Sequence, residues 1–201
     1  NHLFEPHVGN QIFQNMVKCE LFLRTLLGKK ITAIEKHEKG WKVKLNDQKY
    51  DYTLNAKIVV DATEMGDIAA KVGVPYEIGM DSRYTYGEDI APKKENDVIQ
   101  DLTYVMILED FGFDITIEKP VDYDPYNFYC SSESNNCIKE SINRVLWPKD
   151  SLLSYGRLPN GKVMINWPIN GNDYYVNAIE QSFEERKKSF EKAKLKSLQF
   201  L

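Results

Sequence analysis

The chain has 201 residues, of which 42% are hydrophobic and 12% aromatic, a composition typical of a folded core rather than of a disordered segment. Its 26 basic and 30 acidic residues are spread along the chain and give a net charge of -4, which argues against a basic nucleic-acid-binding surface. No apolar run reaches the length of a membrane span, and the first residues lack the pattern of a signal peptide. Because the start resembles the middle of a longer protein, the sequence does not indicate a localisation, cytoplasmic or exported.

The first two predicted elements are a helix and a strand. Apolar residues recur at helical spacing from Val8 to Val17, and Pro6 stands where a helix can begin. An apolar run, 21–27, then ends at Gly28 and is short enough for a buried strand.

Residues 29–54 change to the alternating pattern of antiparallel strands. Trp41, Val43 and Leu45 alternate with lysines, and turn-forming residues interrupt the pattern at 38–40 and 46–48. A meander of three short strands is the simplest interpretation.

The run Ile58–Val60 has no alternation, as expected of a strand buried on both faces. It leads into a turn of small residues that opens a short helix. Ala62, Thr63 and Gly66 would let a ligand approach the backbone there, although a turn without a ligand is an equal alternative from the residues alone. Glu64 and Asp67 are expected to cap this helix rather than to act in catalysis.

The composition shifts after Pro75, which marks the best domain boundary. Residues 76–101 are polar and irregular, 103–108 are predicted to form a strand, and 111–136 form a loop rich in aromatic residues that covers a sheet or lines a pocket. Two hairpin strands, 152–155 and 163–166, are predicted around an Asn-Gly turn. The last segment is a helix with a capping box at Ser182 and Glu185, and with Phe190, Ala193, Leu198 and Leu201 near one face.

The three cysteines cannot all pair, and no zinc-binding spacing is present. Packed or loop thiols are the favoured interpretation for Cys19, Cys130 and Cys137. A disulfide between Cys130 and Cys137 is the alternative if the protein is exported.

Three stretches together resemble a known family. Residues 59–67 read Val-Val-Asp-Ala-Thr-Glu-Met-Gly-Asp, and the stretches 4–8 and 155–174 agree with the same pattern. In these motifs the chain resembles FAD-dependent oxidoreductases of the glutathione-reductase-like class, in a group often labelled xanthan lyases.

The resemblance implies an α/β (α+β) fold. Residues 1–75 would form part of a Rossmann-like FAD-binding domain with a β-meander, residues 76–180 a β-rich substrate domain, and residues 181–201 a helix leading back to the first domain. The cofactor is FAD, and the residues expected near it are Lys30, Ile31, Ala62, Thr63, Glu64 and Gly66. The sequence contains no Gly-x-Gly-x-x-Gly phosphate-binding turn, so we expect a central portion of a flavoenzyme that by itself binds FAD weakly or not at all and is inactive.

A late polar cluster is the candidate substrate site. Its members are Asn166, Trp167, Asn172 and Asp173, whose amides, carboxylate and ring suit a hydroxyl-bearing substrate. A turn stabilised by its own Asn and Asp side chains is the alternative, and the match of this stretch to the family favours a pocket. The sequence assigns no catalytic residue and no metal site.

Two other functions remain open. One is a polysaccharide lyase that acts by β-elimination on an acidic polymer of the xanthan type, and the other is a carbohydrate-binding module without catalysis. The expected partner is a small-molecule or carbohydrate substrate, with no nucleic acid and no membrane, and exposed sheet edges would favour self-association.

Overall fold

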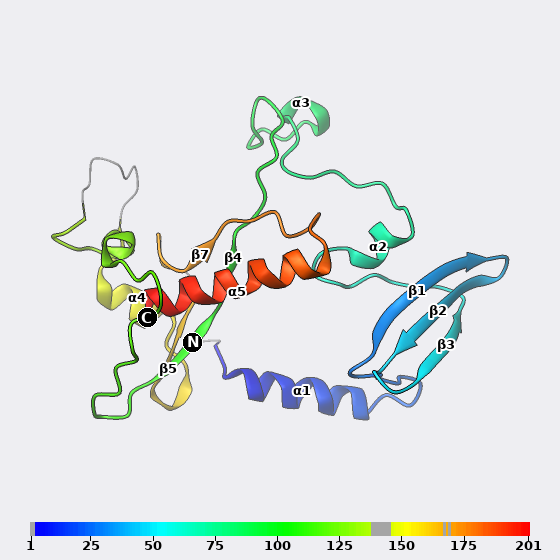
Figure 1. Cartoon of the computed structure of the whole chain (residues 1–201), viewed down its shortest axis with the longest axis horizontal. Helices are drawn as coiled ribbons and strands as arrows, with labels where there is room; N and C mark the ends of the chain where they lie inside the picture. The colour runs from blue at the N-terminus through cyan, green and yellow to red at the C-terminus, as the bar shows by residue number, and fades with distance from the viewer. Residues whose placement is uncertain (1–2, 138–145, 167, 169) are drawn as a thin grey trace. The chain divides into compact units, whose positions relative to one another are not determined.

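The computed structural model describes residues 3–137, 146–166, 168 and 170–201. It contains both helices and short strands, as expected of a mixed α and β fold (Figure 1). The chain divides into two compact units: unit 1 comprises Asn1–Ile12 and Gln100–Leu201, and unit 2 comprises Phe13–Ile99. The predicted domain boundaries at residues 75 and 180 differ from this division and stay a prediction. Within the described part of the chain, every helix is too short or too polar to cross a membrane.

Helix α1, Pro6–Lys18, confirms the first prediction. Pro6 is its first residue, and the Glu5 carbonyl accepts a hydrogen bond from the Val8 N–H at 2.9 Å. The strand predicted at 21–27 is wrong, because this segment is irregular and Leu21 is 92% exposed. An apolar run becomes a strand only where another strand pairs with its backbone, and none of the described residues pairs with it.

The predicted meander is confirmed in unit 2. Strands β1, Lys30–His37, β2, Gly40–Asn46, and β3, Asp51–Ala56, form an antiparallel sheet in the order β1-β2-β3 (Figure 1). Alternate residues Ile34, Val43 and Leu45 are buried on one face and form the core of this unit.

The segment after the meander departs from the prediction. Residues 58–60 are not a strand: Ile58 is 80% and Val60 82% exposed, whereas Val59 packs against the meander core. The expected burial on both faces is therefore wrong, and only one side of the segment is covered. Helix α2, Asp67–Lys71, follows the turn, and Ile68 packs on the same core.

Residues 76–99 are largely irregular, as predicted. The short helix α3, Arg83–Tyr86, begins at Ser82, whose Oγ accepts from the Tyr84 N–H at 3.3 Å. Met80 and Asn96 form an isolated antiparallel bridge that closes the segment.

Unit 1 contains two small antiparallel pairs. Strand β4, Leu102–Thr103, pairs with β7, Asp173–Tyr174, and β5, Met106–Glu109, pairs with β6, Lys162–Ile165. The single strand predicted at 103–108 is interrupted at Tyr104 and Val105. The Tyr104 carbonyl accepts hydrogen bonds from side chains of Asn172 and Ser197, at 3.0 and 2.8 Å, so this backbone group serves another part of the unit.

The hairpin prediction is correct at its turn and wrong at its first strand. Asn160 has a φ of 59° and Gly161 a φ of 71°, as a tight hairpin turn requires, within η3, Pro159–Gly161. Residues 152–155, however, lie in helix α4, Lys149–Tyr155, where Pro148 and an acidic first turn supply the start signals. The backbone that returns beside β6 is 156–158, because the Met164 N–H donates to the Gly156 carbonyl at 2.7 Å.

The buried carboxylate of Glu5 joins the start of the chain to this turn. Asn160 Nδ2 donates to it at 2.6 Å and Lys162 Nζ at 2.8 Å. The hydrogen bond from Lys162 is the main reason that the pKa of Glu5 lies below its ordinary value.

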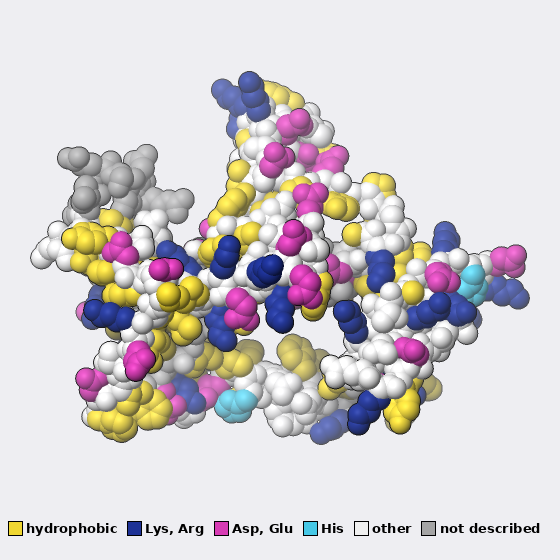
Figure 2. All heavy atoms as spheres, viewed as in Figure 1, with side chains coloured by type: hydrophobic (Ala, Val, Ile, Leu, Met, Phe, Trp, Pro, Cys, Tyr) yellow, Lys and Arg dark blue, Asp and Glu magenta, His cyan; other side chains and the backbone are white. Residues whose placement is uncertain are grey.

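Helix α5, Phe183–Phe200, confirms the final helix and its capping box. Its buried face is formed by Ser189, Ala193 and Ser197, so Ala193 is confirmed, whereas small residues replace the predicted Phe190 and Leu198 in the contact. These small side chains let α5 lie close to β4 and β7, which it contacts in unit 1 (Figure 1). Acidic and basic side chains are intermixed over its outer surface (Figure 2).

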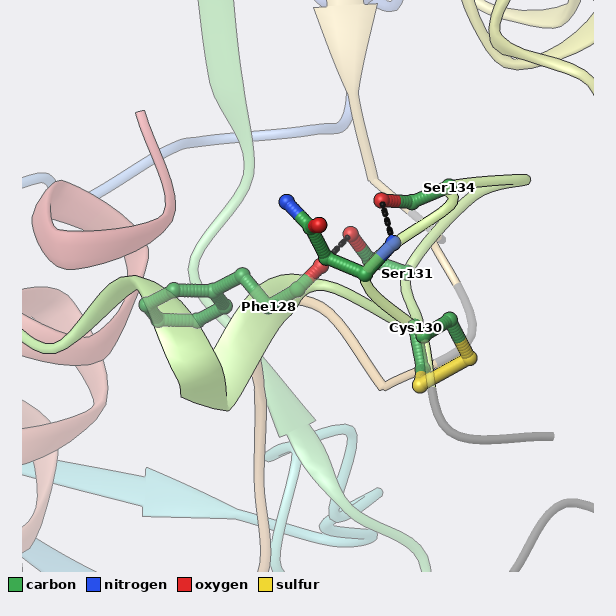
Figure 3. The surroundings of a disulfide bond; sticks show 6 residues. Phe128, Cys130, Ser131 and Ser134 are labelled. Atoms are coloured by element: carbon green, nitrogen blue, oxygen red, sulfur yellow. Dashed lines mark hydrogen bonds between the residues drawn. A yellow bond between two sulfur atoms is a disulfide. The ribbon is translucent and has the colours of Figure 1, made fainter. Parts of the chain in front are cut away.

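Cys130 and Cys137 form a disulfide, so the favoured interpretation as free thiols is wrong for this pair. Figure 3 shows the bond next to a turn in which Ser131 Oγ donates to the Phe128 carbonyl at 2.7 Å. Phe128 ends η1, Pro125–Phe128, and its ring meets the ring of Phe200 edge-on at 5.4 Å. The disulfide therefore closes a loop that directly follows the segment packed on the end of α5.

Replacing both cysteines of this pair with serine is expected to lower the free energy of unfolding by about 2.5 kcal/mol, because a short loop is no longer closed in the unfolded chain. Denaturant titration with and without a thiol reductant measures the loss. Cys19→Ser is the control, since Cys19 is exposed and unpaired with another cysteine. A wild-type protein that is equally stable in both conditions would contradict the prediction.

Candidate functional site

Asp61 anchors the turn that follows residues 58–60. Its Oδ1 accepts from the Thr63 N–H at 2.9 Å, and its Oδ2 accepts from the N–H groups of Ile68 and Ala69 at 3.0 and 2.7 Å. These hydrogen bonds, that of Thr63 first, lower the pKa of Asp61. One carboxylate thus holds both the turn and the first turn of α2.

The residues that begin α2 differ from those predicted. The helix starts at Asp67, and its capping acceptors are Asp61 and the Thr63 hydroxyl, which accepts from the Asp67 N–H at 2.9 Å. Glu64 is therefore not the cap that was expected, and Asp67 lies within the first turn of the helix. The sequence signal for Asp61 was its place as the first polar residue after an apolar run, followed two positions later by threonine.

The turn between these anchors is open to solvent. Ala62, Thr63 and Glu64 are exposed, and Gly66 has a φ of 65° with no atom within 4 Å of the place where a side chain would begin. The positive φ explains why glycine stands there. A ligand can therefore approach the backbone of this turn closely, as its small residues predicted.

The other predicted cofactor contacts begin the meander. Lys30 is exposed, whereas Ile31 packs against the core of unit 2. A charged cluster fixes the residue before them: Lys29 pairs with Asp47, and Tyr52 Oη donates to the same carboxylate at 2.7 Å. The hydrogen bond from Lys29 is the first cause that holds the pKa of Asp47 well below its ordinary value.

Helix α2 ties the two predicted cofactor segments into one unit. Lys71 Nζ donates to the Thr32 carbonyl at 3.0 Å, one residue after Ile31, and the opposite end of α2 is held by Asp61. The start of β1 and the 62–66 turn therefore lie on elements that share one core.

Two members of the predicted substrate cluster line one polar cavity in unit 1. Asn166 and Asp173 meet there with Gln100, Asp101 and Thr103 around a volume of about 280 Å³. The last three were missed as a group, because Gln100 and Asp101 precede β4, Thr103 ends it, and they carry no motif of their own. A second cavity of about 600 Å³ is lined mainly by apolar residues of segment 107–123 and by the end of α5.

The other two members of the predicted substrate cluster are Asn172 and Trp167. Asn172 is fully buried, and its Nδ2 donates to the Tyr104 carbonyl and to Ser197 Oγ at 3.0 and 3.1 Å, so it ties the segment before β7 to α5. Trp167 lies outside the described residues. The role of all four in substrate binding stays a prediction. Among the described residues, no group of three His, Cys, Asp or Glu is placed to hold a metal ion.

Comparison with known proteins decides the family. The family model described as FAD dependent oxidoreductase matches residues 1–201. The chain belongs to this family of FAD-dependent oxidoreductases. Neither the curated proteins nor the solved structures give a match. The family match confirms the resemblance that the 59–67 motif carried, and leaves the xanthan lyase label untested.

The 62–66 turn of this FAD-dependent oxidoreductase fits the cofactor that its family implies. Ala62 and Gly66 leave the backbone accessible, and the helix behind them is capped by protein groups. Such a turn offers a rigid, small-residue surface to a nucleotide. The residues present are thus compatible with FAD at this place.

Proposed function

We propose that this chain contributes the cofactor-contacting part of a flavoenzyme through two segments of unit 2: the start of β1 at Lys30 and Ile31, and the turn of Ala62, Thr63, Glu64 and Gly66. The observation that carries the proposal is the exposed turn held in place by Asp61. FAD supplies hydride transfer when it is bound, and the chain binds and orients it.

The finer fold assignment is part of the same proposal. Residues 1–75 belong to a Rossmann-like FAD-binding domain that includes the meander, residues 76–180 to a β-rich substrate domain, and residues 181–201 to a connecting helix. The meander directly before the 61–66 turn supports this order, since the similar flavoproteins carry one at that point of the chain.

The substrate is proposed to be a small hydroxyl-bearing molecule held near Asn166 and Asp173, with Trp167 and Asn172 in the same stretch. The support is the polar cavity that Asn166 and Asp173 line together. Amide and carboxylate groups at one place satisfy both the donor and the acceptor capacity of a hydroxyl group.

Binding of FAD is the test of the cofactor site. Titration of the chain with FAD, followed by the flavin absorption and fluorescence, is expected to show weak but saturable binding, because the 62–66 turn is in place while the sequence has no Gly-x-Gly-x-x-Gly turn. Ala62→Phe should weaken it by about tenfold, because the added ring occupies the approach to the turn. Ala70→Phe is the matched control, an exposed alanine on α2 outside the proposed contact residues. Equal affinity in both variants, or no binding by the wild-type chain, would contradict the proposed site.

A further inference from the structure

The polar cavity of unit 1 is built where two strand pairs end. Thr103 is the register partner of Asp173 in the β4 and β7 pair, and Asn166 follows Ile165, the last residue of β6. Ile165 pairs with Met106, three residues after Thr103. The chain connection between β4 and β5 therefore brings the end of β6 to the side of the β4 and β7 pair.

The wall of the cavity is held by groups with fixed partners. The Thr103 hydroxyl donates to Asp173 Oδ1, which sets the orientation of that carboxylate and leaves Oδ2 for another donor. Asn172, the residue before Asp173, is fully buried and donates hydrogen bonds to Tyr104 and Ser197. A binding group held in this way loses little conformational entropy when a ligand arrives.

The size of the cavity limits its occupant. A volume of about 280 Å³ lies just below the usual range of small-molecule sites, which suits a single ring or a short chain rather than a polymer segment. The described lining residues are all polar, so an apolar ligand would leave amide and carboxylate groups without partners.

The charge of the lining selects the ligand further. Asp101 and Asp173 are carboxylates, and no Lys or Arg stands among the described lining residues. A ligand carboxylate would meet two like charges, whereas hydroxyl groups can donate to both acids and accept from the amides of Gln100 and Asn166. We propose that this cavity binds a neutral polyhydroxylated molecule, one sugar ring or a polyol, and excludes the corresponding acid. That this molecule is also the substrate of the enzyme rests on the proposed function.

Binding measured by saturation-transfer NMR and calorimetry tests the selection. The probes are glucose, galactose and mannose, each compared with its uronic acid, added to the full 201-residue chain. At least one neutral sugar is expected to bind, and its uronate to bind about tenfold more weakly or worse. A uronate that binds as well as its neutral partner, or the absence of binding by all three neutral sugars, would overturn the proposal.

Variants locate the effect in the cavity. Asp173→Asn keeps the shape of the side chain and the oxygen that accepts from Thr103, but it removes one negative charge. It should therefore lower the ratio of sugar affinity to uronate affinity by at least about threefold. Asp122→Asn is the control, since Asp122 is exposed, lies outside the lining, and has a φ of 56° that asparagine tolerates. An equal effect of both variants would contradict a role for Asp173.

The sugar measurement needs no flavin, so absence of sugar binding can be distinguished from absence of FAD binding, which tests the proposed function. A chain that binds FAD but no neutral sugar contradicts this inference alone. A chain that binds a neutral sugar but no FAD contradicts the proposed cofactor site and leaves the cavity assignment standing.

Discussion

Replacing Gly156 with alanine is expected to destabilise unit 1 by about 3 kcal/mol. A side chain at this position would begin 1.9 Å from the backbone oxygen of Met164. The two segments cannot separate freely, because the Met164 N–H donates to the Gly156 carbonyl at 2.7 Å. The φ of Gly156 is -85°, so the cost comes from the collision and not from the backbone conformation.

Gly112→Ala is the matched control for this measurement. Gly112 has a φ of 72°, and no atom lies within 4 Å of the place where its side chain would begin. Its replacement should cost only the conformational penalty, about 1 kcal/mol. Denaturant titration measures the loss in free energy of unfolding for both variants. Equal losses would contradict the expected collision between a side chain at position 156 and the Met164 backbone.

Asp61→Asn is expected to make the stability of the protein less dependent on acid pH. Hydrogen bonds in the folded state lower the pKa of Asp61 below its ordinary value of 3.8, so the unfolded chain takes up the proton at a higher pH. The stabilisation by Asp61 is therefore complete above that ordinary value and is lost as the pH falls through the lowered folded value. Tm of the wild type should therefore fall more over this range than Tm of the variant, as thermal unfolding at each pH measures.

The pH series needs a control and a second readout. Asp89→Asn removes an exposed aspartate from the same unit and should leave the wild-type pH profile unchanged. Asp61→Ala removes all three hydrogen bonds, so the 62–66 turn loses its anchor and FAD affinity should fall by about a hundredfold. An Asp61→Asn protein with the same pH profile as wild type would contradict the anchoring role.

Elements with local signals were predictable from the sequence. The alternation around Val43 fixes the meander, the serine of the capping box fixes the start of α5, and Asn160 with Gly161 fixes the turn before β6. In each case the residues that determine the structure lie within a few positions of one another. Membership of the FAD-dependent oxidoreductases was likewise predicted from short motifs, at 59–67 together with 4–8 and 155–174, and the family match confirms it.

Elements that depend on distant partners were not predictable. The apolar runs at 21–27 and 58–60 carry the composition of buried strands, but hydrophobicity does not supply the backbone partner that a strand needs. On the buried face of α5, Ala193 was predicted but Ser189 and Ser197 were missed, because the Tyr104 carbonyl binds Ser197 there and its approach favours small residues over large ones. The cavity residues Gln100 and Asp101 reach Asn166 only through the pairing of β5 with β6.

The hydrogen bonds of Glu5 have a consequence for how the protein folds during its synthesis. Glu5 binds Asn160 and Lys162, which are 155 and 157 positions further along the chain, and all of unit 2 is made between them. At the usual pace of a ribosome, roughly 10 to 30 seconds pass before the partners of Glu5 exist. The meander, whose pairings are all local, can fold during this interval, whereas unit 1 must wait for the chain to return. Unit 2 is thus expected to be complete while the first residues of unit 1 still lack their partners.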